Sequence, residues 1–310
     1  MTIPATNLFI QGITLRQLQI FETVVRLGGF TRAAEALNLT QPTVSMQIRK
    51  LADTLQLPLI EQVAGKVHAT AAGREVYRAA VEVLGRISAL SDYASQTRGV
   101  VQGELRLAVI TSAIYFMPRL LGAFVERHPL VVPQLSVNNR RNVLRRLRAN
   151  EDDLLIMGQV PHELSVEAHP FIDNEIVVVA PPSHPLVQAR EIPLARLAQE
   201  KFLVREPGSG TRKAAERVLE ERGVEIRPYM ELGSSEAIKQ GVMAGLGVSV
   251  LSRRNIEREL AGGTIAILDV EGFPITRRWY AVHLRGKELS LAARSFLEFI
   301  LAESDSILAP

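Results

Sequence analysis

The stretch TRAAEALNLTQPTVSMQIRKL, residues 31–51, decides the fold of the N-terminal third of this chain. It contains two short segments of helical pattern separated by the turn 38–40, and Thr40 is a good N-cap for the second segment. Pro42 falls in the first turn of this second helix, where a missing backbone N–H loses no hydrogen bond. The side predicted to be buried consists of Val44, Ile48, Leu51 and Leu55. The sequence therefore predicts two helices joined by a tight turn.

The opposite side of the second helix carries polar and basic residues. Two helices joined by a short turn form the motif that presents the start of its second helix to the DNA major groove. Glutamine, serine and threonine can reach base edges, and arginine and lysine suit phosphates. A solvated helix face is the alternative that this segment alone leaves open. The candidate DNA-binding residues are Arg32, Gln41, Pro42, Thr43, Ser45, Met46, Arg49 and Lys50.

The segment before this pair extends it toward a predicted winged unit over residues 13–70. A helix is expected from Thr14 to the pair Gly28-Gly29, because glycine tolerates the left-handed conformation that ends many helices. Thr31 is expected to cap the short helix that follows. The apolar face of the first helix is predicted to consist of Leu15, Leu18, Phe21 and Val25.

Two short strands, 59–62 and 67–70, are predicted after the second helix of the pair. We interpret their hairpin as a wing that brings Lys66 and His68 near DNA phosphates. Residues 1–100 contain ten Lys or Arg against seven Asp or Glu, whereas the rest of the chain contains 26 of each. The net charge of +3 therefore resides in this part of the chain, which weakly favours a polyanionic partner.

The longest helical pattern covers residues 71–98 and is predicted to be a linker and dimerisation helix. At about 1.5 Å per residue such a helix is on the order of 40 Å long. Its apolar residues follow an a/d seam and are Val76, Ala80, Val83, Ile87, Leu90 and Ala94. Packing on its own domain is the alternative; pairing with a second copy predicts a homodimer or homotetramer and a roughly palindromic site in double-stranded DNA.

After a hinge expected at 99–103, the pattern changes to alternating strands and helices. Such alternation predicts an α/β fold of largely parallel sheets over residues 104–310. We expect two α/β subdomains, the first made of about 104–175 and 283–310 and the second of 176–282.

Three predicted strands end in polar residues, the position at which ligands bind in such folds. In the turn REPGSGT, Ser209 and Thr211 precede a predicted helix whose free N–H groups and dipole favour an anion. An ordinary capped helix is the alternative. The candidate effector-binding residues from these strand ends are Thr111, Ser112, Glu206, Gly208, Ser209, Gly210, Thr211, Ser234 and Ser235.

The succession TRAAEALNLTQPTVSMQIRKLADTLQLPLIEQVAGKVHATAAG resembles the winged helix-turn-helix of LysR-type transcriptional regulators, and the chain is similar to that family to its end. The resemblance implies a C-terminal effector domain of the type 2 periplasmic-binding-protein fold, with the effector between its subdomains. It places Asn138 and Gln159 in the pocket beside the strand-end residues. The family commonly has Arg where this chain has Met46, so the predicted base contacts rest on Gln41, Thr43, Ser45 and Arg49.

Four segments, IMGQVP, FIDNEIVVVAPPSHPL, FLVREPGSGTR and SEAIKQGVMAGLGVSVLS, resemble the branch of the family that activates Rubisco and other Calvin-cycle genes. That resemblance implies an activator that works with RNA polymerase and responds to a small anionic metabolite. A phosphorylated metabolite or NADPH is the expected effector. The branch that controls sulfur assimilation, which shares an EPGSGT-like turn, is the alternative.

Other classes of function receive no support from the sequence. The chain has no cysteine, and its six histidines lack metal-ligand spacing, so no metal site is expected. No GxSxG elbow or other catalytic motif is present, and we expect neither an enzyme nor a bound cofactor. No signal-peptide pattern and no run of eighteen apolar residues occurs, so we expect a cytoplasmic protein without membrane contact. A solute-binding protein is the remote alternative. The arginine-rich segment 140–148 is interpreted as a solvated helix, with contact to a phosphate as the alternative.

Overall fold

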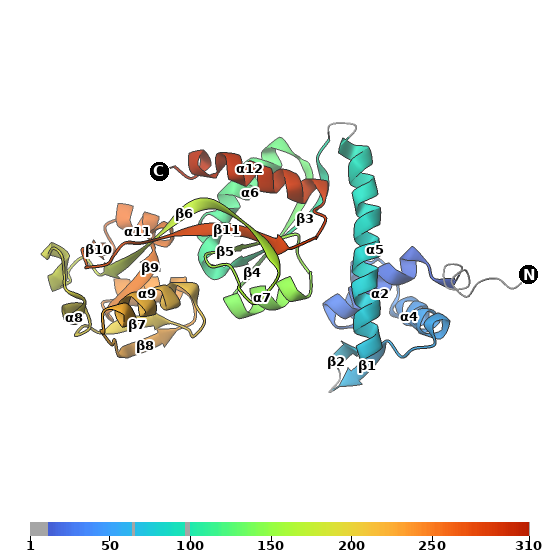
Figure 1. The fold of residues 1–310 in the computed structure, drawn as a ribbon, viewed down its shortest axis with the longest axis horizontal. Coiled ribbons are helices and arrows are strands. Elements are labelled where there is room, and N and C mark those ends of the chain that lie inside the picture. Colours follow the sequence, from blue (N-terminus) through green and yellow to red (C-terminus); the bar gives the residue numbers. More distant parts are fainter. Residues whose placement is uncertain (1–11, 64–65, 97–99, 310) are drawn as a thin grey trace, which may run out of the picture. The chain divides into compact units, whose positions relative to one another are not determined.

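The computed structural model describes residues 12–63, 66–96 and 100–309, and the chain divides between Arg98 and Gly99 into two compact units (Figure 1). The N-terminal unit begins with α2 (Leu15–Leu27), α3 (Phe30–Ala36) and α4 (Gln41–Leu55). Thr14 caps α2, which ends at the left-handed Gly28 as predicted. The prediction for Thr31 is wrong, because the N-cap lies two residues earlier at Gly29 and α3 begins at Phe30.

The inner face of α2 also differs from the predicted face. Ile20 and Val24 are buried together with Phe21, whereas Leu15 is 47% exposed. Of the four predicted residues Phe21 is buried, and Leu18 and Val25 pack partly buried against the same core, so the prediction is wrong only for Leu15. Helical spacing alone allowed two adjacent stripes, and packing against α3 and α4 selects the one with Ile20.

The helix α4 and the wing match their predictions closely. Thr40 caps α4, Pro42 lies in its first turn, and Val44, Ile48 and Leu51 are its buried residues. Strands β1 (Ile60–Val63) and β2 (Lys66–Ala69) pair antiparallel. The core of the unit joins α4 to α2 and to the segment before β1; its most buried members are Phe21, Val24, Val44, Leu51 and Leu59.

The long helix α5 (Ala71–Gln96) is anchored to the winged unit at its first turn. The Thr70 hydroxyl accepts a hydrogen bond from the Gly73 N–H at 2.9 Å and donates to the Pro58 carbonyl oxygen at 2.5 Å. Ala80 is fully buried and Val76 packs against the same core, so these two seam residues make contacts within the chain. The seam residues Val83, Ile87 and Leu90 are 39%, 47% and 66% exposed, and the side chain of Ala94 lies outside the described residues.

The C-terminal unit is built on one nine-stranded sheet in which β6 and β11 lie at the centre. The first lobe contains the parallel strands β3 (Gln102–Ile110), β4 (Leu130–Asn138) and β5 (Leu154–Met157). The second lobe contains the parallel strands β7 (Phe202–Arg205), β8 (Pro228–Leu232) and β9 (Val248–Ser252). The antiparallel strands β6 (Val166–Ala180) and β11 (Ile275–Leu284) connect the lobes, and β10 (Ala266–Leu268) pairs with β6 (Figure 1).

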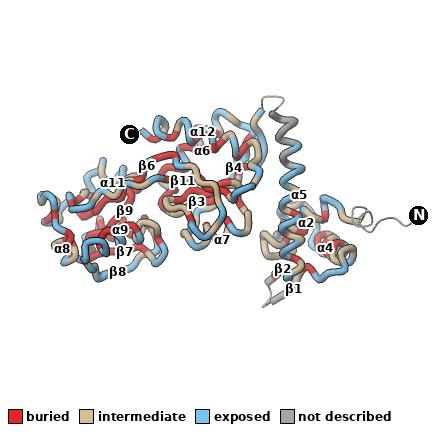
Figure 2. Tube along the Cα trace, in the orientation of Figure 1, coloured by how far each residue is buried: buried red, intermediate tan, exposed pale blue. Residues whose placement is uncertain are grey.

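Helices cover both faces of each lobe. In the first lobe, α6 (Met117–Arg127) and α12 (Leu291–Ile307) pack on one face and α7 (Arg140–Arg148) packs on the other. In the second lobe, α9 (Gly210–Glu221) and α10 (Ser235–Met243) contribute to separate cores. The remaining short helices are η1 (Thr111–Tyr115), η2 (Pro185–Gln188), α8 (Leu194–Leu197), η3 (Arg253–Ile256) and α11 (Glu257–Ala261). Figure 2 shows the buried positions along β3, β6, β9 and β11, between these layers.

Two boundaries and the arrangement of the sheet differ from the predictions in this unit. The predicted hinge 99–103 overlaps β3, because Gln102 already pairs with Leu130, and residue 99 lies outside the described part. The predicted return to the first subdomain at residue 283 is late, because Trp279 already lies in the core of the first lobe. The two lobes also share one sheet, which β6 and β11 connect. The first half of β6 and the whole of β11 were not predicted as strands, because polar residues interrupt their apolar pattern.

Two glycines of α5 give opposite expectations for stability. A Cβ at Gly73 would lie 2.0 Å from the Leu59 carbonyl oxygen, whereas a Cβ at Gly85 would have nothing within 4 Å. Gly73→Ala should destabilise the N-terminal unit by about 1–3 kcal/mol or more, because a rigid backbone atom must move. Gly85→Ala should stabilise it by up to about 1 kcal/mol, because alanine is the better helix former. Calorimetric unfolding of the full chain measures both, and changes of the same sign would contradict the close packing of α5 on Leu59.

Candidate functional site

The outward face of α4 brings together the residues predicted to read DNA. Gln41, Pro42, Arg49 and Lys50 are exposed, and Met46 at the centre of the face is 48% exposed. Thr43 and Ser45 are partly buried at its border. Because the other side of α4 is held in the core, this face has a defined orientation relative to α2 and α3. The helix therefore presents both hydrogen-bonding and cationic groups outward.

Local hydrogen bonds limit what some of these side chains can do. The Thr43 hydroxyl lies 2.8 Å from the Thr40 hydroxyl, so it takes part in the cap of α4. The Arg32 guanidinium donates to the carbonyl oxygen of Gly28 at 3.1 Å and is exposed near the end of α2. His68 is exposed on β2, and the side chain of Lys66 lies outside the described residues. Of the polar residues near the start of α4, Ser45 carries no such capping bond among those described.

A pocket in the C-terminal unit forms where β3, β5 and β7 end and α9 begins, beside β6 and β11. This is the strand-end position that the sequence predicted for a ligand. Seven of the eleven predicted effector residues line it: Thr111, Ser112, Gln159, Glu206, Ser209, Gly210 and Thr211. The topology thus gathers segments that are about 100 residues apart in the chain, because the ends of parallel strands meet at one edge.

The other four predicted residues do not line this pocket. Ser234 caps α10 by accepting a hydrogen bond from the Ala237 N–H at 3.1 Å. Ser235 is buried and contacts the pocket only through an arginine. Gly208 occupies an exposed turn with φ +90°, and Asn138 ends β4 next to Ile110. Each of them belongs to a strand end beside the pocket rather than to its wall.

Arg205 is a pocket residue that the sequence analysis missed. It is only 4% exposed, and its guanidinium is paired with the carboxylate of Glu206 at 2.7 and 2.9 Å. It also donates to the hydroxyl of Ser235 at 2.7 Å and to the hydroxyl of Thr111 at 3.1 Å. Because Thr111 follows β3 of the first lobe and Ser235 begins α10 of the second, Arg205 connects the two lobes with its charge compensated.

Arg140 and Arg277 also line the pocket, and their charges are not compensated in this way. Arg140 donates to the Gln159 carbonyl oxygen at 2.7 Å, and Arg277 lies 3.5 Å from the Gly210 carbonyl oxygen. Within the described residues neither forms an ion pair with a carboxylate. Burial lowers the pKa of both guanidinium groups; the charges of Arg217 and Arg140 lower the pKa of Arg277 further, and the Glu163 carboxylate partly offsets the effect of burial on Arg140. A bound anion would relieve this unfavourable concentration of positive charge.

Further polar groups of the pocket have no partner within the described residues and are available to a ligand. The indole Nε1–H of Trp279 is buried and has no acceptor among the described residues, and the amide Oε1 of Gln159 has no donor there. Ser209 stands at the N-cap of α9, but its side chain makes no capping hydrogen bond. The expectation that the Ser209 side chain caps α9 is therefore wrong, and the alternative of a helix end without a ligand stays open. Donors from three elements converge on one pocket, which suits a small ligand with anionic oxygens.

The sequence pattern did not predict Arg140, Arg205 or Arg277 as pocket residues, for two different reasons. Arg205 is the first residue of the turn REPGSGT, whose hydroxyl and glycine residues carried the prediction, and Arg277 lies beside Arg278 in a strand that the sequence pattern did not predict. Arg140 begins the basic segment 140–148, which was interpreted as a solvated helix. That interpretation is wrong for Arg140, whereas Arg146 of the same helix forms an ion pair with Asp152 at 2.6 Å outside the pocket. The packing of α7 on the sheet decides that Arg140 lines the pocket and that Arg146 pairs with Asp152 outside it.

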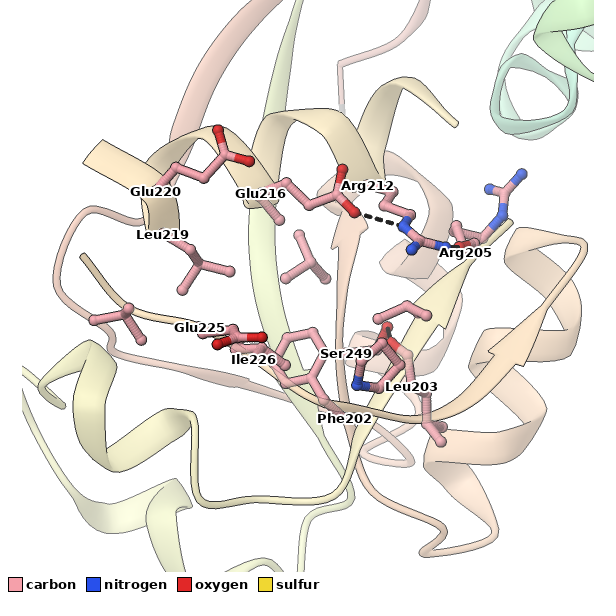
Figure 3. A pocket seen from close by; sticks show the side chains of 15 residues that line it. Phe202, Leu203, Arg205, Arg212, Glu216, Leu219, Glu220, Glu225, Ile226 and Ser249 are labelled. Atoms are coloured by element: carbon pink, nitrogen blue, oxygen red, sulfur yellow. Dashed lines mark hydrogen bonds and ion pairs between the residues drawn. The ribbon is translucent and has the colours of Figure 1, made fainter. Parts of the chain in front are cut away.

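A second pocket lies between α9 and the strands β7 and β9 (Figure 3). Phe202, Leu219 and Ile226 form apolar walls, and three glutamates, Glu216, Glu220 and Glu225, lie around it. The one ion pair drawn there joins Arg212 to Glu216 at 2.6 Å (Figure 3). Arg205 and Arg212 also line this second pocket, but each is paired with a glutamate, so an anion would meet more favourable charges in the pocket with Arg140 and Arg277.

A helix-turn-helix face and a two-lobed unit with a cationic pocket define a ligand-responsive DNA-binding protein. Residues 98–305 match the family model described as LysR substrate binding domain, and residues 15–74 match Bacterial regulatory helix-turn-helix protein, lysR family. The chain belongs to the LysR family of transcriptional regulators. Among the described residues no helix is both long and apolar enough to cross a membrane.

Relatives with known names are similar over almost the whole chain. The RuBisCO operon transcriptional regulator of Allochromatium vinosum is 47% identical over 292 residues, which are 94% of this chain and 97% of the relative. A protein of the same name from Acidithiobacillus ferrooxidans is 45% identical over 295 residues, 95% and 96% of the two chains. The solved regulatory domain of Synechocystis PCC6803 CcmR in complex with 2-PG is 45% identical, with a TM-score of 0.63, and the match covers 65% of this chain and 97% of that domain.

Replacing Arg277 or Arg140 by glutamine should weaken the binding of inorganic phosphate to the C-terminal unit. Each variant loses one charged hydrogen-bond donor, worth about 1.5–3 kcal/mol, which corresponds to roughly a ten- to hundredfold rise in Kd. Arg141→Gln is the matched control, because Arg141 is an exposed neighbour of Arg140 on α7 and does not line the pocket. Isothermal titration calorimetry of the full chain measures the three values. Equal weakening in all three variants would show a nonspecific charge effect.

Proposed function

We propose that this chain is a regulator of carbon-fixation genes whose binding to promoter DNA is modulated by a small anionic metabolite. The observation that carries the proposal is the pair Arg140 and Arg277, which form no ion pair among the described residues, beside the start of α9, where Ser209 makes no side-chain cap. The 45–47% identity to two RuBisCO operon regulators supports the target genes. The 2-PG bound to the similar CcmR domain supports a small effector. The effector is a metabolite with phosphate or carboxylate oxygens, with NADPH as a further candidate.

The effector acts by favouring one arrangement of the two lobes. Arg205 already spans them, and the hydroxyl of Tyr115 in η1 donates to Glu236 of α10 at 3.0 Å. Burial and the neighbouring Glu236 carboxylate raise the pKa of Tyr115, so its phenol remains a donor at neutral pH. A ligand that contacts groups from both lobes binds best when they are held at one distance, and it shifts the population toward that arrangement. Promoter binding changes only as far as the two arrangements differ in DNA affinity.

The DNA-binding unit works as part of a homodimer or homotetramer. Pairing with a second copy is supported by exposed seam residues of α5, which are Val83, Ile87 and Leu90. Apolar side chains at heptad spacing can pack against the same residues of a second helix, and removing them from water is favourable. Two copies would present two α4 helices to a roughly palindromic promoter site. The proposed activator cooperates with RNA polymerase in the cytoplasm, acts without enzymatic activity and uses no cofactor.

DNA footprinting on the promoter beside the gene that encodes this chain tests the proposed target genes and the proposed effector together. With 2-PG, phosphoenolpyruvate, NADPH and O-acetylserine added in turn, one anionic compound should change the length of the protected DNA. A response to O-acetylserine alone would support the sulfur-assimilation alternative. Affinity for the same DNA should fall steeply with salt, because phosphate contacts release counterions. Absence of salt-dependent binding would leave only the solute-binding alternative.

Two variants should separate the DNA-binding activity from the effector-binding activity. Ser45→Ala removes a hydroxyl from the border of the α4 face and should weaken specific DNA binding by about 1–3 kcal/mol if it reads a base, with effector affinity unchanged. Arg277→Gln should do the reverse. Fluorescence anisotropy with promoter and scrambled DNA measures the specific DNA affinity of each variant, and calorimetry measures its effector affinity. Loss of both activities in both folded variants would contradict a two-unit mechanism.

A further inference from the structure

Three metal-ligating side chains converge where β6 and β11 pair in the first lobe. Glu167 and His169 alternate on β6, and His283 on β11 lies directly opposite Glu167 in the antiparallel register. Alternation along β6 places Glu167 and His169 on one face, and the diagonal neighbour across the pair, His283, shares that face. None of the three lines either pocket described above. The site is therefore separate from the anion-binding pocket.

The distances within this group match those of ligands around one metal ion. The two Nε2 atoms of His169 and His283 are 3.4 Å apart, and the imidazole rings are stacked at 16°. Two imidazole nitrogens on one tetrahedral Zn²⁺, each about 2.0–2.1 Å from the ion, lie about 3.4 Å apart. The carboxylate of Glu167 lies 3.8 Å from His283 Nε2, and all three ligand atoms lie within 4.8 Å of one another. The Glu167 side chain is 45% exposed and has room to move closer to the two imidazole nitrogens.

The protonation of His283 is set by its backbone neighbour. Its Nδ1 lies 3.0 Å from the Leu284 carbonyl oxygen, which can only accept, so Nδ1–H is the donor. In the neutral ring Nε2 then carries the lone pair, and this lone pair faces His169. A carbonyl behind a ligating imidazole is the usual way in which proteins orient the ring toward a metal. His283 is 5% exposed, so its position is held by packing as well.

A direct hydrogen bond between the two rings is the competing account of the same geometry. It requires His169 Nε2–H to donate to His283 Nε2, and the 3.4 Å separation is longer than the usual 2.7–3.2 Å. A metal ion requires the other tautomer of His169, with the lone pair on Nε2. The two accounts therefore differ in a measurable property of one ring.

We propose that Glu167, His169 and His283 form a site for Zn²⁺. Two imidazoles and one carboxylate favour zinc over magnesium or calcium, which prefer oxygen ligands alone. Three protein ligands leave the fourth tetrahedral position open to water or to a second molecule. The bound ion joins β6 to β11, the two strands that connect the lobes, at their first-lobe end. The proposal goes beyond the regulation of carbon-fixation genes and does not depend on it.

Zinc titration of the chelator-treated full chain, with a chromophoric competitor, tests the site. We expect one saturable equivalent per chain, and His169→Gln and His283→Gln should each weaken the affinity by at least about tenfold, since each removes a direct ligand. Glu167→Gln should weaken it as well. His184→Gln is the matched control, because His184 is also mostly buried and lies 3.4 Å from Glu200, but has no second imidazole beside it. Absence of saturable binding, or equal affinity in the wild type and both histidine variants, would overturn the proposal.

Two measurements on the wild-type chain keep the test valid if a histidine variant unfolds. Substitution by Co²⁺ should produce the strong visible absorption of tetrahedral coordination, and its absence at saturation would refute the site. Long-range ¹H–¹⁵N spectra of histidine-labelled protein should show His169 changing to an unprotonated, metal-bound Nε2 when Zn²⁺ is added. A ring of His169 that still carries a proton on Nε2 at saturating Zn²⁺ would establish the direct hydrogen bond instead.

Discussion

One buried guanidinium holds the C-terminal unit in the form that creates a pocket. Arg205 ends β7, pairs with Glu206 and donates to hydroxyl groups of both lobes. Removing one partner of such a buried pair leaves an uncompensated charge and costs about 3–5 kcal/mol, so the two residues depend on each other. The neighbouring Arg212 donates to the Arg205 carbonyl oxygen at 2.8 Å, which connects β7 to α9. The position of the α9 N-terminus therefore follows from the position of Arg205.

Cations near this edge of the sheet have different partners, and the difference creates selectivity. Arg205 and Arg146 have carboxylates at hydrogen-bonding distance, whereas Arg140 and Arg277 contact backbone carbonyls. Burying a charge without an opposite charge is unfavourable, and an anionic ligand is the group that compensates it. An anion bound beside Arg140 and Arg277 would therefore meet two guanidinium groups that form no ion pair among the described residues. In the second pocket, by contrast, each arginine is paired with a glutamate.

Much of the DNA-binding unit could be predicted from the sequence because its signals are local. The cap at Thr40, the proline in the first turn and the stripe of Val44, Ile48 and Leu51 all lie within twelve residues and are confirmed. The inner face of α2 could not be chosen in this way, because Leu15 and Ile20 belong to adjacent stripes of similar polarity. The seam of α5 was similarly ambiguous, and its first part is used within the chain at Ala80.

In the C-terminal unit the sequence by itself determined the class of fold, most of the strands and the strand-end position of the pocket. Seven predicted residues line that pocket because the ends of parallel strands meet wherever the strands pair. Only the tertiary structure decided which charges meet there, since Arg140, Arg205 and Arg277 come from three elements up to 137 residues apart. The same holds for His169 and His283, which are 114 residues apart and adjacent only across the β6–β11 pair. Local patterns follow from backbone geometry, whereas these contacts depend on the register of long antiparallel strands, which no short segment specifies.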